Sequence, residues 1–295
     1  MKYYIAVDIG GTTFNSGLFN DSFVKVDVTN KDKIRYYKNK NQIVSAIENQ
    51  VLDLLKKNKV DKNDVLGLGV ASPGPLDIDK GIILDTINLK DFQNYNLCDD
   101  FTKRLNIKTY IQNDANLFAF GEWYGKYKDM DVIVGITIGT GFGIGLILDG
   151  RMYHGAHGYG MEYSVSPYEW GICEENISIR YIRHQAKKIY GEELSPRVIE
   201  KYYYNGDLKA CEIYNNLGKN LGKALSHVIN MLDPSIITIG GGLSNAFDCF
   251  KDSMYVEIKK HSPSFVRNRI DVLPSNLKEE STMLGACLYI KQRII

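Results

Sequence analysis

A local pattern that occurs twice constrains the fold of this chain more than any other feature of its sequence. At residues 3–19, an apolar run leads into a tip rich in glycine and threonine, and a second apolar run follows. The same order returns at residues 132–148. Glycines between two β-rich runs predict a hairpin with exposed backbone amides at its tip. The repeat therefore predicts two copies of one supersecondary unit.

Each predicted hairpin tip can hold a phosphate group. Adjacent backbone amides form an anion-binding concavity, and Thr12 and Thr13 add hydroxyl donors at the first tip. Asp8 supplies a carboxylate that can reach a magnesium ion, directly or through water. Taken alone, the first tip is equally compatible with an ordinary tight hairpin. The second copy at residues 139–143 favours the phosphate-binding interpretation.

Composition excludes several classes of function. The chain has 295 residues and is 44% hydrophobic, enough to bury the core of one or two domains. Its 36 basic residues are balanced by 35 acidic ones, which gives no electrostatic case for binding nucleic acid or a membrane surface. No apolar segment has the length or flanks of a membrane span or a secretory signal, so we expect a cytoplasmic protein. The five scattered cysteines indicate neither a disulfide framework nor a cysteine zinc site.

The first half of the chain reads as an alternation of strands and helices. Runs at 23–28 and 34–37 are β-like, apolar residues repeat at helical spacing over 43–55, and a second helix is expected near 97–105. The apolar run 65–70 predicts a strand buried on both faces, followed by a turn that contains Gly74. A glycine at the carboxyl end of a buried strand can let a ligand approach the backbone, although a rigid turn between two prolines is an equal alternative.

Asn113 and Asp114 stand where a predicted strand, 109–111, passes into a predicted helix with its apolar residues at 117–123. An aspartate at this position is often a helix N-cap that accepts backbone hydrogen bonds. The alternative is a carboxylate directed into the ligand crevice as a general base, oriented by its asparagine neighbour.

The pattern restarts after residue 128, which predicts an N-terminal α/β domain over 1–128 and a larger α/β domain over 129–295. We expect that the last helix, near 281–291, can return to the first domain. Within the second domain, the apolar run 236–239 leads into three consecutive glycines and then a helix. Such a junction lets a ligand lie close against the backbone.

Five motifs in this order resemble the ROK family of sugar kinases and repressors, within the actin, hexokinase and Hsp70 superfold. They are DIGGT (8–12), SPGPLD (72–77), NDAN (113–116), IGTGFG (138–143) and IGGGL (239–243). The resemblance covers nearly the whole chain. It implies an α/β fold of two ribonuclease-H-like (actin-like ATPase) domains that close over a central cleft. It also implies ATP and Mg²⁺ as cofactors, a small-molecule sugar held against the N-terminal domain, and a homodimer.

The resemblance also implies roles for individual residues. Asp114 is expected to act as the base that takes the proton from the sugar 6-hydroxyl, and Asn113 to hold neighbouring sugar hydroxyls. Gly74 and Asn88 would line the sugar pocket. The nucleotide and its magnesium ion would be held by Asp8, Gly10, Gly11, Thr12, Thr13, Gly139, Thr140, Gly141, Gly240, Gly241 and Gly242. Thr13 stands where the family often carries a lysine, so cationic help from that position is absent.

The chain departs from the family pattern at residues 160–178. Glu162 and Glu174 align with the two sugar-binding glutamates, but Val165 falls where the family has a zinc-binding histidine, and the cysteine cluster is missing. Cys173 alone cannot build a tetrahedral zinc site, so no zinc is expected. Fewer contacts beside C1 and C2 of the sugar favour N-acetylmannosamine over glucose, and a glucokinase or a β-glucoside kinase is the alternative.

A sugar-responsive repressor of the same family is a competing interpretation. Such proteins resemble this chain but carry a helix-turn-helix domain before the first hairpin, and here that hairpin begins near Lys2. A sugar-binding protein without catalysis is a further alternative. The presence of Asp114 together with both hairpin tips favours an enzyme.

Overall fold

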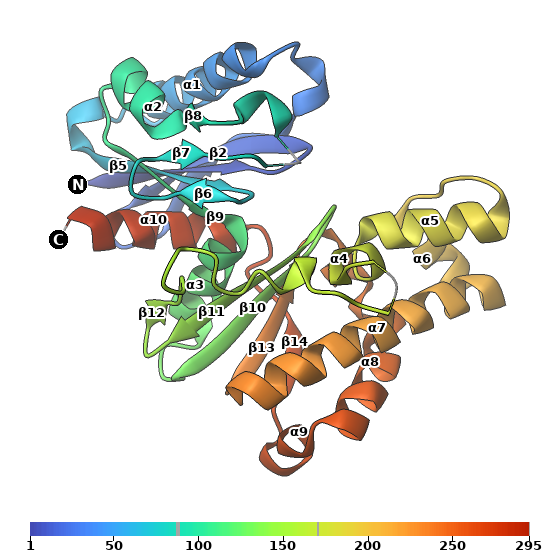
Figure 1. Cartoon of the computed structure of the whole chain (residues 1–295). Coiled ribbons are helices and arrows are strands. Elements are labelled where there is room, and N and C mark those ends of the chain that lie inside the picture. The colour runs from blue at the N-terminus through green and yellow to red at the C-terminus, as the bar shows by residue number, and fades with distance from the viewer. Residues whose placement is uncertain (87–88, 170, 295) are drawn as a thin grey trace. The chain divides into compact units, whose positions relative to one another are not determined.

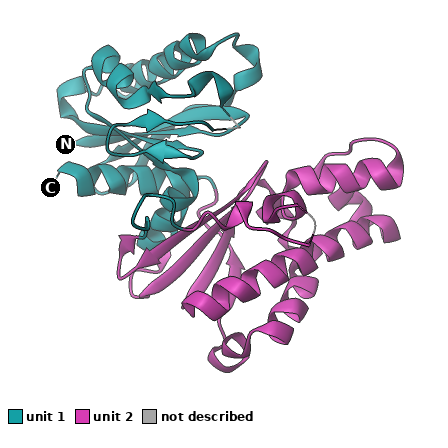
Figure 2. Cartoon of the chain, in the orientation of Figure 1, with its two compact units in different colours: residues 1–125, 153–160, 279–295 teal, residues 126–152, 161–278 magenta. Residues whose placement is uncertain are grey.

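A computed structural model of the chain describes residues 1–86, 89–169 and 171–294 (Figure 1). The chain divides into two compact units (Figure 2). Unit 1 consists of Met1–Gly125, Tyr153–Gly160 and Glu279–Ile295, and unit 2 of Lys126–Met152 and Met161–Lys278. The C-terminal helix α10 (Glu280–Ile294) thus lies in unit 1, far in sequence from the rest of that unit.

Unit 1 is built on a mixed β-sheet with the strand order β3-β2-β1-β5-β9, in which the short β4 also pairs with β2. Its strands are β1 (Tyr3–Ile9), β2 (Thr13–Asn20), β3 (Lys25–Val28), β4 (Asp32–Lys33), β5 (Val65–Ser72) and β9 (Thr109–Asn113). β1 and β2 form the expected antiparallel hairpin, and β1, β5 and β9 run parallel. The carboxyl ends of these three strands therefore meet at one edge of the sheet.

Helices cover both faces of this sheet (Figure 1). They are α1 (Lys40–Lys57), α2 (Leu97–Leu105) and α10, while α3 (Asp114–Lys126) packs against α10. α1 buries an apolar stripe against β2, and α10 packs against β5 and β1 on the other face. A small second sheet joins β6 (Leu76–Asp77), β7 (Ile82–Ile83) and β8 (Tyr95–Asn96). Short 3-10 helices lie at η1 (Ile34–Tyr36), η2 (Lys62–Asp64) and η3 (Lys90–Phe92).

The structure confirms the helix expected at 97–105 and corrects two expected strands. The run 34–37 is not a strand: η1 occupies it, because the amide of Tyr37 donates to the carbonyl of Ile34 at 3.0 Å and closes a tight turn. The strand expected at 23–28 begins only at Lys25. Phe23 has a φ of 62°, a left-handed conformation that belongs to the turn between β2 and β3.

Unit 2 repeats the arrangement of the main sheet in unit 1. Its strand order is β12-β11-β10-β13-β14, with β10 and β11 antiparallel and β10, β13 and β14 parallel. The strands are β10 (Val132–Ile138), β11 (Phe142–Leu148), β12 (Arg151–Met152), β13 (Ile236–Gly240) and β14 (Asp271–Pro274). The duplication that the sequence predicted is therefore a duplication of topology: each unit places a glycine-rich hairpin tip at the carboxyl edge of its sheet.

The helices of unit 2 bury the apolar core of this second sheet. They are α4 (Cys173–Asn176), α5 (Ile179–Tyr190), α6 (Pro196–Tyr204), α7 (Leu208–Leu232), α8 (Phe247–His261) and α9 (Pro263–Asn268), with 3-10 helices η4 (Tyr163–Val165) and η5 (Gly242–Ala246). α7 and α8 pack along each other. Over the described residues, no helix has both the length and the apolar character that crossing a membrane requires.

Candidate active site

The first hairpin tip joins β1 to β2 in unit 1. The amide of Gly10 donates to the carbonyl of Thr13 at 2.9 Å, and the carbonyl of Thr12 accepts from the amide of Ile34 at 3.0 Å. The amides of Gly11 and Thr12 have no acceptor among the described residues. The amide of Gly10 and the carbonyls of Thr12 and Thr13 thus hold the tip in place. The amides of Gly11 and Thr12 remain available as two adjacent donors, as an anion-binding loop requires.

Asp8 lies near the carboxyl end of β1, directly before this tip. Asp8 is partly buried. Burial, followed by the charge of Asp114, raises the pKa of Asp8 to about 7. Lys31 acts in the opposite direction, and Glu279 adds a smaller upward effect. Unit 1 therefore brings Asp8 and Asp114 into electrostatic contact, although 106 positions separate them in the sequence.

Asn113 and Asp114 stand at the junction between β9 and α3. The side-chain Oδ1 of Asn113 accepts from the amides of Ala115 at 2.9 Å and Asn116 at 3.2 Å, which is the geometry of a helix cap. Asp114 Oδ1 also accepts from the amide of Ala115, at 2.9 Å. Asn113 thus does most of the capping, which fixes the backbone that carries Asp114 at the carboxyl edge of the sheet.

Two further residues predicted to contact a sugar belong to unit 1. Gly74 follows β5 at the same edge of the sheet as Asn113, because β5 and β9 run parallel and Ser72 lies opposite Asn113. Asn88 lies outside the described residues. The assignment of both residues to a sugar pocket stays a prediction.

The second hairpin tip joins β10 to β11 in unit 2. The amide of Gly139 donates to the carbonyl of Gly141 at 2.9 Å. The carbonyl of Gly139 accepts from the amide of Ile179 at 2.9 Å, and the carbonyl of Thr140 accepts from Nε of Arg180 at 3.0 Å. The amides of Thr140 and Gly141 have no acceptor within the described part of the chain. The second tip thus resembles the first in presenting two adjacent free N–H donors.

Glu174 contacts the second tip directly. Its Oε2 accepts from the amide of Phe142 at 3.0 Å, and its Oε1 pairs with Arg180. A side chain at Gly141 would have to displace this carboxylate from its place at the tip. Both carboxylate oxygens of Glu174 are thus engaged within unit 2 and support the tip. The sequence-based role of Glu174 as a sugar ligand stays a prediction.

Glu162 directly precedes η4, and Val165 at the end of η4 is 61% exposed. The neighbouring Tyr163 places its hydroxyl 2.6 Å from Nδ1 of His227, which anchors η4 to α7. Glu162 is therefore carried by a short helical turn that is fixed to the core of unit 2. Its role toward a sugar also stays a prediction.

The glycines at 240–242 end β13 and begin η5. Gly241 has a φ of 80°, and an added Cβ would lie 2.6 Å from the carbonyl oxygen of Ile138. Only glycine therefore permits the end of β13 to approach the end of β10 so closely. This approach places the three-glycine turn beside the strand that leads into the second tip.

The donor set of unit 1 is compatible with magnesium. Mg²⁺ usually binds one or two carboxylates and completes its coordination with water and phosphate oxygens, so Asp8 with Asp114 nearby is a sufficient protein contribution. No three His, Cys, Asp or Glu side chains within the described residues form a metal-binding group. The expectation that the protein needs no zinc stays a prediction.

Sequence reasoning did not identify three residues that the structure places at these tips. Lys31 and Glu279 form an ion pair of 2.6 Å and both act on the charge of Asp8, while Arg180 supports the second tip. Lys31 supplies a cation near Asp8 in a chain that has Thr13 where a lysine was expected from the family pattern. No local pattern marks these residues, because each contact joins distant segments of the chain.

Comparison with known proteins agrees with this arrangement. A model of the ROK family matches residues 4–293. A glucokinase of Thermotoga maritima is 30% identical over 98% of this chain and 98% of its own length, and a beta-glucoside kinase of Listeria innocua is 26% identical over 97% of each. A ROK family glucokinase from Streptomyces griseus, solved in complex with glucose and AMPPNP, superposes with a TM-score of 0.84 at 23% identity and covers 98% of this chain and 99% of that one. This likeness confirms the expected actin-like ATPase fold. The chain belongs to the ROK family.

Proposed function

We propose that this protein is an ATP-dependent sugar kinase that transfers the γ-phosphate of ATP to the 6-hydroxyl of a hexose. Family membership and the names of its relatives support kinase chemistry. The observation that carries the proposal is the arrangement in unit 1, where Asp114 lies in electrostatic contact with Asp8 beside the free amides of Gly11 and Thr12. This arrangement combines a base, a metal-binding carboxylate and a phosphate loop.

In the proposed reaction, Asp114 accepts the proton of the sugar 6-hydroxyl as that oxygen attacks the γ-phosphorus. A well-placed base contributes roughly 10²–10⁴-fold to the rate. Asn113 supports the base in two ways: Oδ1 caps α3 and holds the backbone, and Nδ2 is available to donate to a sugar hydroxyl. Phosphoryl transfer depends chiefly on positioning and charge neutralisation, so few reacting groups are needed.

Phosphate groups would be held by backbone amides at the two tips. The free amides of Thr140 and Gly141 would act like those of Gly11 and Thr12. The turn at 240–242 would receive the adenosine, where the absence of side chains lets a ligand lie against the backbone. A magnesium ion held by Asp8, directly or through water, would neutralise phosphate charge.

The preferred substrate in this proposal is N-acetylmannosamine. Val165 stands where the family has a zinc-binding histidine that contacts the sugar, and a smaller apolar side chain there leaves room for a 2-acetamido group. Glucose is the second candidate, because the relative at 30% identity is named a glucokinase. A homodimer in the cytoplasm is part of the same proposal, and light scattering of the purified protein would measure the assembly.

An assay of ADP release tests the proposed function. The purified protein is mixed with Mg-ATP and, separately, N-acetylmannosamine, glucose, fructose, allose and a β-glucoside. The proposal expects sugar-dependent release of ADP, fastest with N-acetylmannosamine. No release with any sugar would reject kinase activity, whereas fastest release with glucose would replace only the preferred substrate.

A further inference from the structure

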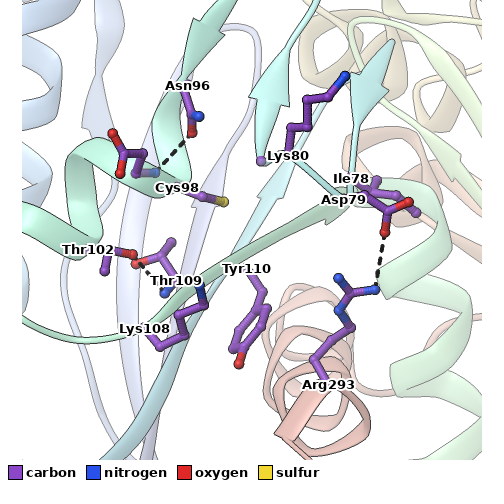
Figure 3. Close-up of a pocket in the computed structure, with 12 residues that line it drawn as sticks. Ile78, Asp79, Lys80, Asn96, Cys98, Thr102, Lys108, Thr109, Tyr110 and Arg293 are labelled. Atoms are coloured by element: carbon purple, nitrogen blue, oxygen red, sulfur yellow. Dashed lines mark hydrogen bonds and ion pairs between the residues drawn. The ribbon is translucent and has the colours of Figure 1, made fainter.

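A cavity of about 240 Å³ lies within unit 1 (Figure 3). Four segments line it: the turn between β6 and β7, the junction of β8 with α2, the first residues of β9, and the end of α10. The cavity meets β9 at Thr109, whereas Asp114 follows the other end of this strand. Four residue steps separate Thr109 from Asn113, which corresponds to about 13 Å along the strand. The cavity is therefore a separate site.

Basic side chains outnumber acidic ones in the lining of this cavity. Lys80, Lys108 and Arg293 contribute positive charge, against the carboxylates of Asp79 and Asp99. Lys80 and Asp99 pair with residues that do not line the cavity, at 3.1 Å with Asp77 and 2.6 Å with Lys103. Lys108 has no carboxylate within 4.0 Å among the described residues. The lining therefore contains one uncompensated cation.

The Arg293 guanidinium makes two weak contacts, of which one is with the ring of Tyr289, 6.0 Å from the centroid. Its Nη1 lies 3.4 Å from Oδ1 of Asp79, a carboxylate with 81% of its side chain exposed (Figure 3). An exposed ion pair of this length contributes little, so a ligand with a higher charge can replace Asp79. The guanidinium can then bind two oxygens of that ligand at once.

Lys108 and Arg293 both act on the Cys98 thiol, which belongs to the cavity lining. Burial raises its pKa to about 12, and the charges of Lys108 and Arg293 oppose this effect. The two cations lie on different segments, at the start of β9 and at the end of α10, and both act on one atom of the lining (Figure 3). Lys108 and Arg293 therefore both lie within electrostatic reach of one point of the lining.

We infer that this cavity binds a small phosphate-bearing anion through Lys108 and Arg293. A phosphate monoester carries close to two negative charges at neutral pH, enough to satisfy Lys108 and to compete with Asp79 for Arg293. A carboxylate carries one charge and offers fewer acceptors. The volume lies below the range of about 300–1,000 Å³ that is usual for larger organic ligands, which favours phosphate itself or the phosphate of a small metabolite.

A binding titration followed by NMR tests this inference. The backbone amides of Asp99, Thr109 and Tyr110 are monitored while inorganic phosphate replaces chloride at constant ionic strength. The inference expects saturable shifts at these amides, and affinity weakened about tenfold or more in Lys108→Gln and Arg293→Gln. Lys201→Gln, an exposed lysine on α6 in unit 2, is the matched control and should leave the affinity unchanged.

Two further ligands give the phosphate assignment its own test. Glucose 6-phosphate should produce the same shifts as inorganic phosphate, and it should bind more tightly if the natural ligand is a phosphate ester. Acetate at the same ionic strength should bind at least tenfold more weakly than phosphate. Absence of saturable shifts with both phosphate ligands, an unchanged affinity in Lys108→Gln, or equal binding of acetate would overturn the inference.

Discussion

The carboxylate of Asp114, at the start of α3, lies close enough to Asp8 in β1 to contribute, after burial, to the rise in its pKa to about 7. Two carboxylates in one poorly solvated place repel each other, and a proton or a divalent cation relieves that repulsion. The contact therefore connects the proposed base to the proposed magnesium ligand. Because the pKa of Asp8 is raised, its protonation state can be followed by titration in the absence of substrate.

The stability of the metal-free protein should fall as pH rises from about 4 to 7. The pKa of Asp8 is higher in the folded chain than its ordinary value of 3.8, so the folded state binds more protons over this window. The loss is complete above the folded pKa and amounts to about 4 kcal/mol for this group, because the pKa is raised from 3.8 to about 7. Urea unfolding at pH 5 and pH 8 measures the free energy of unfolding at each pH. Asp8→Asn should reduce the difference between these two free energies. The control variant Asp53→Asn, on the exposed face of α1, should leave this difference unchanged. An equal pH dependence of stability in Asp8→Asn and wild type would contradict the prediction.

Removal of the Lys31 charge should raise the pKa of Asp8 further. Lys31 is the cation that favours the ionised form of this carboxyl group, while its ion-pair partner Glu279 acts in the opposite direction. A carbon-13 NMR titration of the aspartate side chains would follow Asp8 in Lys31→Gln. The neighbouring Lys33→Gln removes an equal charge from β4 and serves as the control. If both variants shift the pKa of Asp8 equally, the shift comes from the changed net charge of the protein. The prediction that Lys31 acts specifically on Asp8 would then be wrong.

Arg180→Gln should raise the KM for ATP by about tenfold and change the KM for the sugar little, because Arg180 holds both Glu174 and the carbonyl of Thr140 at the second tip. Arg183→Gln, an exposed position on the same helix, should behave like wild type. Steady-state kinetics with each substrate varied in turn measures both constants.

Glu174→Gln separates the two roles considered for Glu174. Support of the tip through Phe142 predicts a higher KM for ATP, whereas a sugar ligand predicts a higher KM for the sugar. A rise in the sugar KM alone would show that the supporting role is not the important one.

Zinc chelators should not unfold the protein. Cys173 is buried and lacks the cysteine partners of a structural zinc site, so folding should not depend on zinc. Thermal melts with and without a strong chelator are expected to coincide, and metal analysis of the purified protein should find no stoichiometric zinc. A lower melting temperature with chelator, or one zinc per chain, would contradict this expectation.

Local signals explain which parts of the structure could be predicted from the sequence. The hairpin tips, the helix at 97–105 and the strand before Asn113 follow from glycine positions and apolar periodicity, which act over a few residues. The expected strand at 34–37 was wrong because β-branched and aromatic residues also occur in a 3-10 turn when a short-range hydrogen bond closes it.

Contacts between distant segments explain what could not be predicted. Phe142 and Glu174 are 32 residues apart, and Lys31 and Glu279 are 248 apart. Nothing in the neighbouring sequence of either partner marks such a pair. The return of α10 to unit 1 creates the second contact, and it brings Arg293 to the cavity beside Lys108. Site residues that depend on chain topology therefore became visible only in the folded structure.

The most direct test of the proposed mechanism is the rate of sugar 6-phosphate formation from Mg-ATP by wild type and Asp114→Asn, followed by phosphorus-31 NMR. The substitution keeps the size of the side chain but removes the base, so turnover should fall by roughly 10²–10⁴-fold. Sugar affinity, measured separately by calorimetry, should remain close to that of wild type. A sugar 6-phosphate product in wild type and its near absence in Asp114→Asn would support the account. Near-normal turnover in Asp114→Asn would contradict it.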